Sequence, residues 1–215
     1  MKNLIYKELR LSVHPSVYMF LCFSSFLLIP SWPYFIAFGY IFMGFMNTFF
    51  LGRTNQDIFF TTSLPVRKKD VVRARVLSIA MFEVLQVAAA IPFAIMSSMI
   101  YPHGNMAGMN PNFAFFGFVL IMYAIFNCVF FPLFYKSAYK VGISVLVGVI
   151  ASTVFVIAVE FAIRAVPLFA ANLNARGAGH LESQLVVLVA GIGIFALATW
   201  LASRRAANNF EKVDL

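Results

Sequence analysis

Few side chains of this sequence could carry out chemistry, and the most informative ones lie inside long apolar runs. Glu83 and Gln86 are three residues apart, so a helix places them on the same side. A carboxyl group inside a membrane-crossing helix is costly unless it faces a partner or water, which makes Glu83 a functional candidate. A structural hydrogen bond to another helix is the alternative interpretation. Asn127, in a later apolar run, could also bond across helices.

The motifs of common catalytic centres do not occur in the sequence. There is no GxxxxGKS or GxxxxGKT loop for nucleotide phosphates, no HExxH zinc motif and no GxSxG nucleophile elbow. The histidines His14, His103 and His180 are far apart in the chain, which argues against a metal cluster. We therefore expect no enzyme activity, no catalytic residue, no metal and no cofactor in this chain.

The composition shows which solvent must surround these residues. Of the 215 residues, 62% are hydrophobic and 11% are charged, and the mean hydropathy is +0.88. A soluble domain has about 25% charged residues, so a chain this apolar needs lipid around it. The net charge of +8 does not indicate nucleic-acid binding, because the charges lie between apolar runs instead of on one exposed face.

Six apolar segments are long enough to cross a bilayer as helices, which predicts an all-α polytopic membrane protein in a single domain over residues 1–215. A spanning helix needs about 20 mostly apolar residues, because its backbone groups must pair inside the lipid. Pro92 lies within the third segment and is expected to kink it. The predicted segments are 16–29, 34–51, 76–101, 113–133, 141–163 and 185–203.

The basic residues predict the orientation of these spans, because cytoplasmic loops are enriched in Lys and Arg. Fourteen of the 16 basic residues fall on one side, and only Arg164 and Arg176 fall on the other. Both termini are therefore predicted in the cytoplasm, with the chain in a bacterial inner membrane. The fourteen are Lys2, Lys7, Arg10, Arg53, Arg67, Lys68, Lys69, Arg73, Arg75, Lys136, Lys140, Arg204, Arg205 and Lys212.

Three pieces outside the spans have patterns of their own. Residues 1–12 place apolar side chains on one helical face with basic ones beside them, which is typical of a helix lying in the membrane interface. The external loop 164–184 is expected to contain short helices, and residues 204–215 form a basic cytoplasmic tail. Glu160 and Arg164 have the i, i+4 spacing of a local ion pair at the membrane surface.

The cytoplasmic loop 52–75 is predicted to contain a short amphipathic helix over the sequence RTNQDIFFTTSL. Thr54 or Asn55 could cap this helix, and Asp57 then lies in its first turn, where the helix dipole favours a negative charge. Pro65 ends the helix, and a basic run leads into the third span.

This order of elements resembles the six-span permease subunits of ABC-2 type exporters. The resemblance covers the whole chain: the basic N-terminus MKNLIYKELRL, two spans, the loop with LPVRKKDVVRAR, four more spans and a basic tail. It is similar to the short bacterial branch that includes the membrane subunit of phenol-soluble-modulin exporters. The resemblance implies a dimer of two permease copies, homo- or heteromeric, with two separate cytosolic ATPase subunits that bind ATP and magnesium.

The resemblance also implies roles for particular residues. The loop would hold the coupling helix that contacts the ATPase, with a basic surface beside it that meets the ATPase or anionic lipid; the alternative is a loop that only lies on the membrane. Glu83, Gln86 and Asn127 would face the substrate path or the dimer interface. The coupling residues are Asn55, Gln56, Asp57, Ile58, Phe59 and Phe60, and the basic surface is Arg67, Lys68, Lys69, Arg73 and Arg75.

Three functions compete for these features. The first is an exporter permease that moves an amphipathic peptide, a toxin or a lipid-like molecule. The second is a six-span small-molecule-binding subunit of a vitamin-type importer, which would not need an aromatic coupling segment. The third is an integral-membrane enzyme, for which the sequence lacks a convergent set of nucleophile, base or metal ligands.

Overall fold

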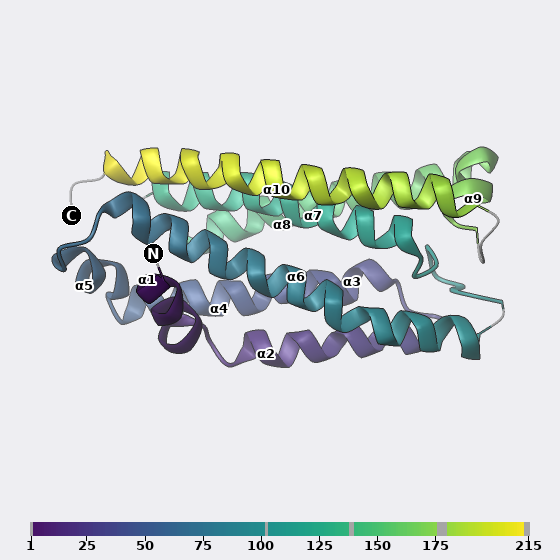
Figure 1. Ribbon diagram of the computed structural model, residues 1–215, viewed down its shortest axis with the longest axis horizontal. Coiled ribbons are helices and arrows are strands. Elements are labelled where there is room, and N and C mark those ends of the chain that lie inside the picture. The colour runs from purple at the N-terminus through teal and green to yellow at the C-terminus, as the bar shows by residue number, and fades with distance from the viewer. Residues whose placement is uncertain (1, 102, 138–139, 176–179, 213–215) are drawn as a thin grey trace.

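The computed structural model describes residues 2–101, 103–137, 140–175 and 180–212, and this part of the chain is all-helical, as predicted. The long helices run side by side as an elongated bundle (Figure 1). The elements are α1 (Lys2–Lys7), the π-helix η1 (Glu8–Ser12), α2 (Ser16–Leu21), the 3₁₀-helix η2 (Cys22–Leu28), α3 (Tyr34–Gly39), α4 (Ile41–Thr54), α5 (Asp57–Ser63), α6 (Lys68–Ile100), α7 (Phe113–Lys136), α8 (Val141–Ala165), α9 (Pro167–Leu173) and α10 (Leu181–Glu211).

Five helical segments of the described chain are long and apolar enough to cross a membrane: α3 with α4, α6, α7, α8 and α10. The first predicted span, 16–29, is different, because the segments Lys2–Ser12 and Ser16–Leu28 meet at 86°. The second of them consists of six α-helical and seven 3₁₀-helical residues. A 3₁₀-helix rises by about 2.0 Å per residue, so this segment reaches roughly 23 Å, which is shorter than the hydrocarbon thickness of about 30 Å.

Two helices extend well beyond the predicted spans. Helix α6 begins at Lys68 and has 33 residues, which makes it about 50 Å long at 1.5 Å per residue. It continues through Pro92. Helix α10 has 31 residues and ends at Glu211. Because the hydrocarbon core is only about 30 Å thick, the charged ends of both helices project beyond it.

Helix α7 lies at the centre of the bundle. A Cβ atom on Gly117 would lie 2.5 Å from the carbonyl oxygen of Val187 in α10, so the two backbones touch there. On the other side of α7, aromatic rings fill the space toward α4. The rings of Phe42 and Phe126 stack with their centroids 4.0 Å apart, and this packing of large rings stabilises the contact.

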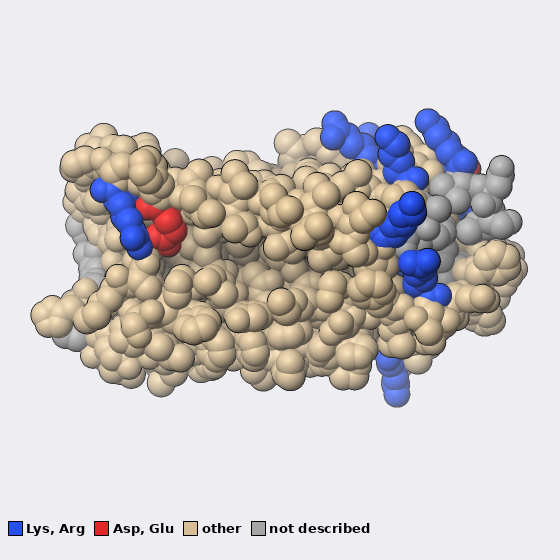
Figure 2. All heavy atoms as spheres, turned by 180° about the vertical axis from the view of Figure 1, so that it is seen from behind, with Lys and Arg blue, Asp and Glu red and all other residues tan. Residues whose placement is uncertain are grey.

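The basic side chains are distributed unevenly along the bundle. Figure 2 shows Lys and Arg side chains gathered mainly at one end of the molecule. In Figure 1 the same end holds α1, α5, the start of α6 and the end of α10. Helix α9 lies at the opposite end, next to Arg164 in the last turn of α8. The gathering of basic side chains mainly at one end agrees with the predicted grouping, while Arg176 lies outside the described residues. The membrane face that this end occupies stays a prediction.

The end of the bundle near α9 corrects one prediction. In the described structure, Glu160 and Arg164 do not pair with each other. Glu160 Oε1 accepts a hydrogen bond from the backbone N–H of Met109 at 3.1 Å, and Arg164 Nη2 donates to the carbonyl oxygen of Ala107 at 2.6 Å. A Cβ atom on Gly108 would lie 2.5 Å from Glu160 Oε1. Both charged side chains therefore hold the loop before α7 instead of each other.

Candidate functional site

Helix α5 forms the tip of the basic end of the molecule, outside the spans (Figure 1). The chain turns into it at Gln56, whose φ of 51° is left-handed. The capping prediction is wrong: Thr54 is the last residue of α4, and no described side chain caps α5. Asp57 occupies the first turn of the helix, as predicted.

The Asp57 carboxylate belongs to a charged cluster that joins three elements. Arg75, in the second turn of α6, donates to Glu8 of η1 through Nε at 2.8 Å and through Nη2 at 3.2 Å. Its Nη2 also donates to Asp57 Oδ2. Glu8 and Arg75 are only 3% and 4% exposed. Charge-assisted contacts of this kind are the strongest hydrogen bonds in proteins.

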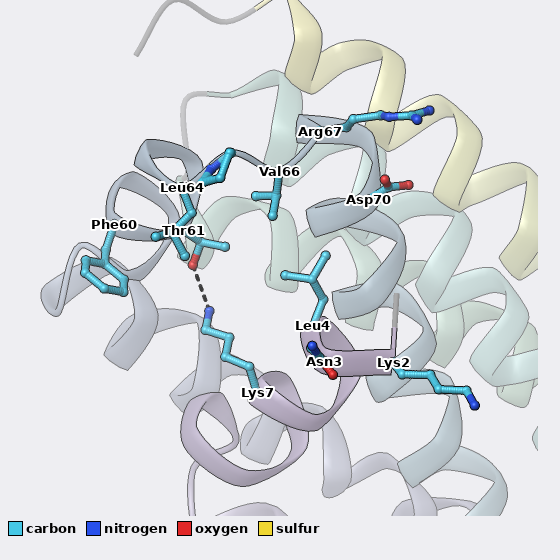
Figure 3. Close-up of a pocket in the computed structure, with 11 residues that line it drawn as sticks. Lys2, Asn3, Leu4, Lys7, Phe60, Thr61, Leu64, Val66, Arg67 and Asp70 are labelled. Carbon is cyan, nitrogen blue, oxygen red and sulfur yellow. Dashed lines mark hydrogen bonds between the residues drawn. The ribbon is translucent and has the colours of Figure 1, made fainter.

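Lys7 closes this cluster from the N-terminal helix. Its Nζ lies 2.5 Å from Asp57 Oδ1, 3.2 Å from Glu8 Oε1 and 2.9 Å from Thr61 Oγ1; the bond to Thr61 is drawn in Figure 3. We call Lys7, Glu8, Asp57 and Arg75 the charged joint. It contains two cations and two anions, so burial of each charge is compensated by an opposite one.

The electrostatics of the joint favour an ionised Asp57. Burial raises the pKa of the Asp57 carboxyl, but the charges of Arg75 and Lys7 outweigh burial and hold this pKa below its ordinary value. The carboxylate therefore stays charged at neutral pH and fixes the first turn of α5 to the bundle.

The predicted aromatic residues of α5 are exposed. Phe59 and Phe60 are 59% and 66% exposed, and Asn55 and Gln56 are also exposed. Ile58 lies within α5, but its side chain is outside the described structure. Two large exposed rings on a helix fixed by ion pairs form a surface suited to protein binding.

Four of the five predicted basic residues lie near the surface beside α5. Arg67 and Arg73 are exposed, and Lys68 and Lys69 are half-buried. Lys69 Nζ lies 3.0 Å from Glu211 Oε2 near the end of α10. This pair links the start of α6 to the end of α10, and the two arginines leave the surface positively charged.

Arg75 corrects the prediction, because it is buried in the charged joint instead of lying on the basic surface. The local sequence pattern does not indicate Lys7, Glu8 and Thr61 as parts of the site. Glu8 could have been noticed, because it is the only acidic residue in an otherwise basic N-terminal segment. Its partner lies 67 residues away in sequence, so no local pattern identifies the pair.

A cavity of about 660 Å³ lies between α1, α5 and the start of α6. Figure 3 shows Phe60 and Leu64 on one side of it and the N-terminal helix on the other. Its lining combines apolar side chains with both signs of charge. The lining residues are Lys2, Asn3, Leu4, Lys7, Phe60, Thr61, Leu64, Pro65, Val66, Arg67 and Asp70.

A comparison with known protein families identifies the family of this chain. Residues 3–206 match the model of the ABC-2 family transporter proteins. The chain belongs to the ABC-2 family. The comparisons found no match among curated proteins and none among solved structures. The family consists of permease subunits of ABC transporters, which work with an ATPase partner, so this chain is a multi-pass permease subunit.

The interior of this ABC-2 permease contains the polar residues first noticed in the sequence. Asn127 Nδ2 in α7 donates to Glu83 Oε2 in α6 at 2.8 Å and lies 3.2 Å from Thr199 Oγ1 in α10. Glu83 and Asn127 are fully buried. One carboxamide therefore joins three spanning helices.

Gln86 joins a second set of segments one turn further along α6. Its Nε2 donates to the carbonyl oxygens of Ala37 at 3.3 Å and Phe20 at 3.4 Å, and its Oε1 accepts from the hydroxyl of Tyr123 at 2.5 Å. Glu83, Gln86 and Asn127 are therefore buried inside the chain, and their hydrogen bonds join its helices. Their position on a substrate path or a dimer interface stays a prediction.

Proposed function

We propose that this ABC-2 permease is the membrane subunit of an exporter and that α5 is its coupling helix, bound by a separate cytosolic ATPase. The observation that carries the proposal is the exposed pair Phe59 and Phe60 on a helix fixed by Asp57. Aromatic anchors of this kind concentrate binding energy in protein interfaces, because they bury a large area at little entropic cost.

The position of α5 at the basic end supports a cytoplasmic location. Cytoplasmic loops are enriched in Lys and Arg, and α5 lies among the basic residues of the described chain. We place this end and both termini in the cytoplasm of a bacterial cell, with the spans in the inner membrane. The exposed Arg67 and Arg73 would then meet an acidic ATPase surface or anionic lipid headgroups.

The complete transporter in this proposal contains two permease copies and two ATPase subunits, and ATP with magnesium binds to the ATPases. The described bundle is packed by aromatic rings around α7, so one chain leaves little room for a path. A path for an amphipathic peptide, a toxin or a lipid-like molecule would lie between two copies. Closure of the ATPase dimer would move α5, and the charged joint would pass this movement to α6 and the N-terminal helix.

The family match favours this function over both alternatives. An importer's small-molecule-binding subunit and an integral-membrane enzyme do not need two exposed aromatic rings on a fixed cytoplasmic helix. An ATPase gene beside the gene of this chain would add independent support.

Binding of the ATPase tests the proposal directly. The double variant Phe59→Asp with Phe60→Asp should fail to retain the ATPase in a pull-down, because two charges replace the apolar anchors. The matched control is Met106→Asp, which changes a 79% exposed apolar side chain in the loop before α7, at the opposite end. Retention of the ATPase by the double variant, or its loss from the control, would refute the assignment of α5.

A further inference from the structure

A second large cavity lies at the opposite end of the molecule, between α6, the start of α7 and the start of α10. Its volume is about 720 Å³, within the usual range of about 300–1,000 Å³ for ligand sites. None of the described residues that line it is charged.

This cavity is long and follows the membrane-crossing direction of α6. Its lining extends along that helix from Val87 to Tyr101, which is roughly 21 Å at 1.5 Å per residue. One half of the hydrocarbon core is about 15 Å deep. The lining along α6 is therefore longer than one half of the hydrocarbon core, which is enough for an extended acyl chain.

Polarity changes along the cavity. The part lined by Val87, Ile91 and Leu188 is aliphatic, and the polar side chains gather near the loop after α6. Most of these polar groups already have partners. Asn112 Nδ2 donates to the carbonyl oxygen of Leu173 at 2.7 Å, and Gln184 Nε2 donates to that of Ala175 at 2.9 Å. Because these polar groups are hydrogen-bonded within the protein, the cavity offers mainly hydrocarbon surface to a ligand.

The cavity opens toward lipid. Ile91 and Ile95 line it, and these side chains of the spanning helix α6 are 48% and 56% exposed. The cavity wall is thus continuous with the apolar surface that contacts the bilayer, so an acyl chain can enter sideways without crossing water.

We propose that this cavity binds an acyl chain of a membrane phospholipid from the half of the bilayer near α9. The uncharged lining, the length of the cavity and its lateral opening all match a hydrocarbon chain whose polar head stays near Tyr101 and Asn105. The site does not depend on the assignment of α5, because it lies at the other end of the bundle and uses none of the same residues.

Photocrosslinking of the full-length permease tests this site. A photoreactive benzoyl-phenylalanine is introduced at Ile95 or, as a control, at Val154, which is 61% exposed on α8 and does not line the cavity. The protein is reconstituted with radiolabelled phosphatidylethanolamine, solubilised in detergent, washed and irradiated. We expect labelled lipid to remain crosslinked at position 95 and to be lost at position 154.

The second part of the experiment fills the cavity with a larger side chain. Ala94 is only 5% exposed and faces the cavity, so Ala94→Trp should abolish lipid crosslinking at position 95. If that variant fails to fold, Ser98→Trp narrows the cavity from its exposed rim and should have the same effect. Equal loss of label at positions 95 and 154, crosslinking to a second permease copy, or unchanged label in a folded tryptophan variant would overturn the proposal.

Discussion

The guanidinium of Arg75 binds the carboxylate of Glu8 with 2.8 Å between Nε and Oε2, although 67 residues separate them in sequence. Both side chains are buried. This pair attaches the N-terminal helix to α6, and Asp57 attaches α5 to the same guanidinium. Three elements that the sequence presents as separate therefore share one charged centre.

Loss of either partner of this pair should destabilise the permease. Removing one member of a buried ion pair typically costs about 3–5 kcal/mol, because the other charge stays buried without compensation. We expect Arg75→Ala and Glu8→Ala to lower the free energy of unfolding by that order in detergent. The matched control is Lys69→Ala, whose exposed pair with Glu211 should contribute about 0–1 kcal/mol. Equal small losses in all three variants would contradict the role of the joint.

Asp57 makes the stability of the permease depend on pH. Its pKa in the folded protein is lower than its ordinary value of 3.8. The ionised carboxylate therefore stabilises the fold above that value, and the contribution is lost as the pH falls from about 3.8 toward the folded-state pKa. The difference in unfolding free energy between wild type and Asp57→Asn should be constant near neutral pH and shrink in acid. A difference that grows on acidification would show that the sign is wrong.

The contact between α7 and α10 depends on small residues. A Cβ atom on Gly117 would meet the Val187 backbone, which cannot move aside as a flexible side chain can. We expect Gly117→Ala to lower stability by about 1–3 kcal/mol through overpacking. Gly193→Ala is the control, because no described atom lies within 4 Å of the added carbon, and alanine favours a helix over glycine by about 1 kcal/mol. Thermal unfolding in detergent compares the two.

The interior pair of Glu83 and Asn127 should behave as a link between helices. Glu83→Gln preserves an oxygen that can accept the 2.8 Å bond from Asn127, so export and ATPase assembly should remain close to wild type. Asn127→Leu removes the donor from a buried carboxyl group and should destabilise the fold by about 1–3 kcal/mol. Strong loss of export by folded Glu83→Gln, with normal assembly, would instead indicate a position on the substrate path.

Much of the architecture follows from local sequence patterns. Apolar runs of sufficient length predict α6, α7, α8 and α10, and the placement of Lys and Arg predicts which helix ends lie together. The first span is less regular than predicted, because part of it is the 3₁₀-helix η2. Periodicity alone does not distinguish a 3₁₀-helix from an α-helix in a uniformly apolar run.

Only those features of the candidate site that depend on a single segment could be predicted from the sequence. The exposed Phe59 and Phe60 and the first-turn position of Asp57 follow from the loop sequence itself. The burial of Arg75 does not, because it depends on carboxylates from η1 and α5. The i, i+4 spacing of Glu160 and Arg164 also predicted an ion pair that does not form in the described part of the chain, because both side chains bind backbone groups of the neighbouring loop instead.

The charged joint has no net charge, since Lys7 and Arg75 balance Glu8 and Asp57. A membrane voltage acts on net charge, at about 2.3 kcal/mol per elementary charge for each 100 mV. The electric field of the membrane voltage therefore exerts no net force on the charged joint. A substitution that removes a single member leaves one uncompensated charge there, and the same joint would then respond to the electrical state of the cell.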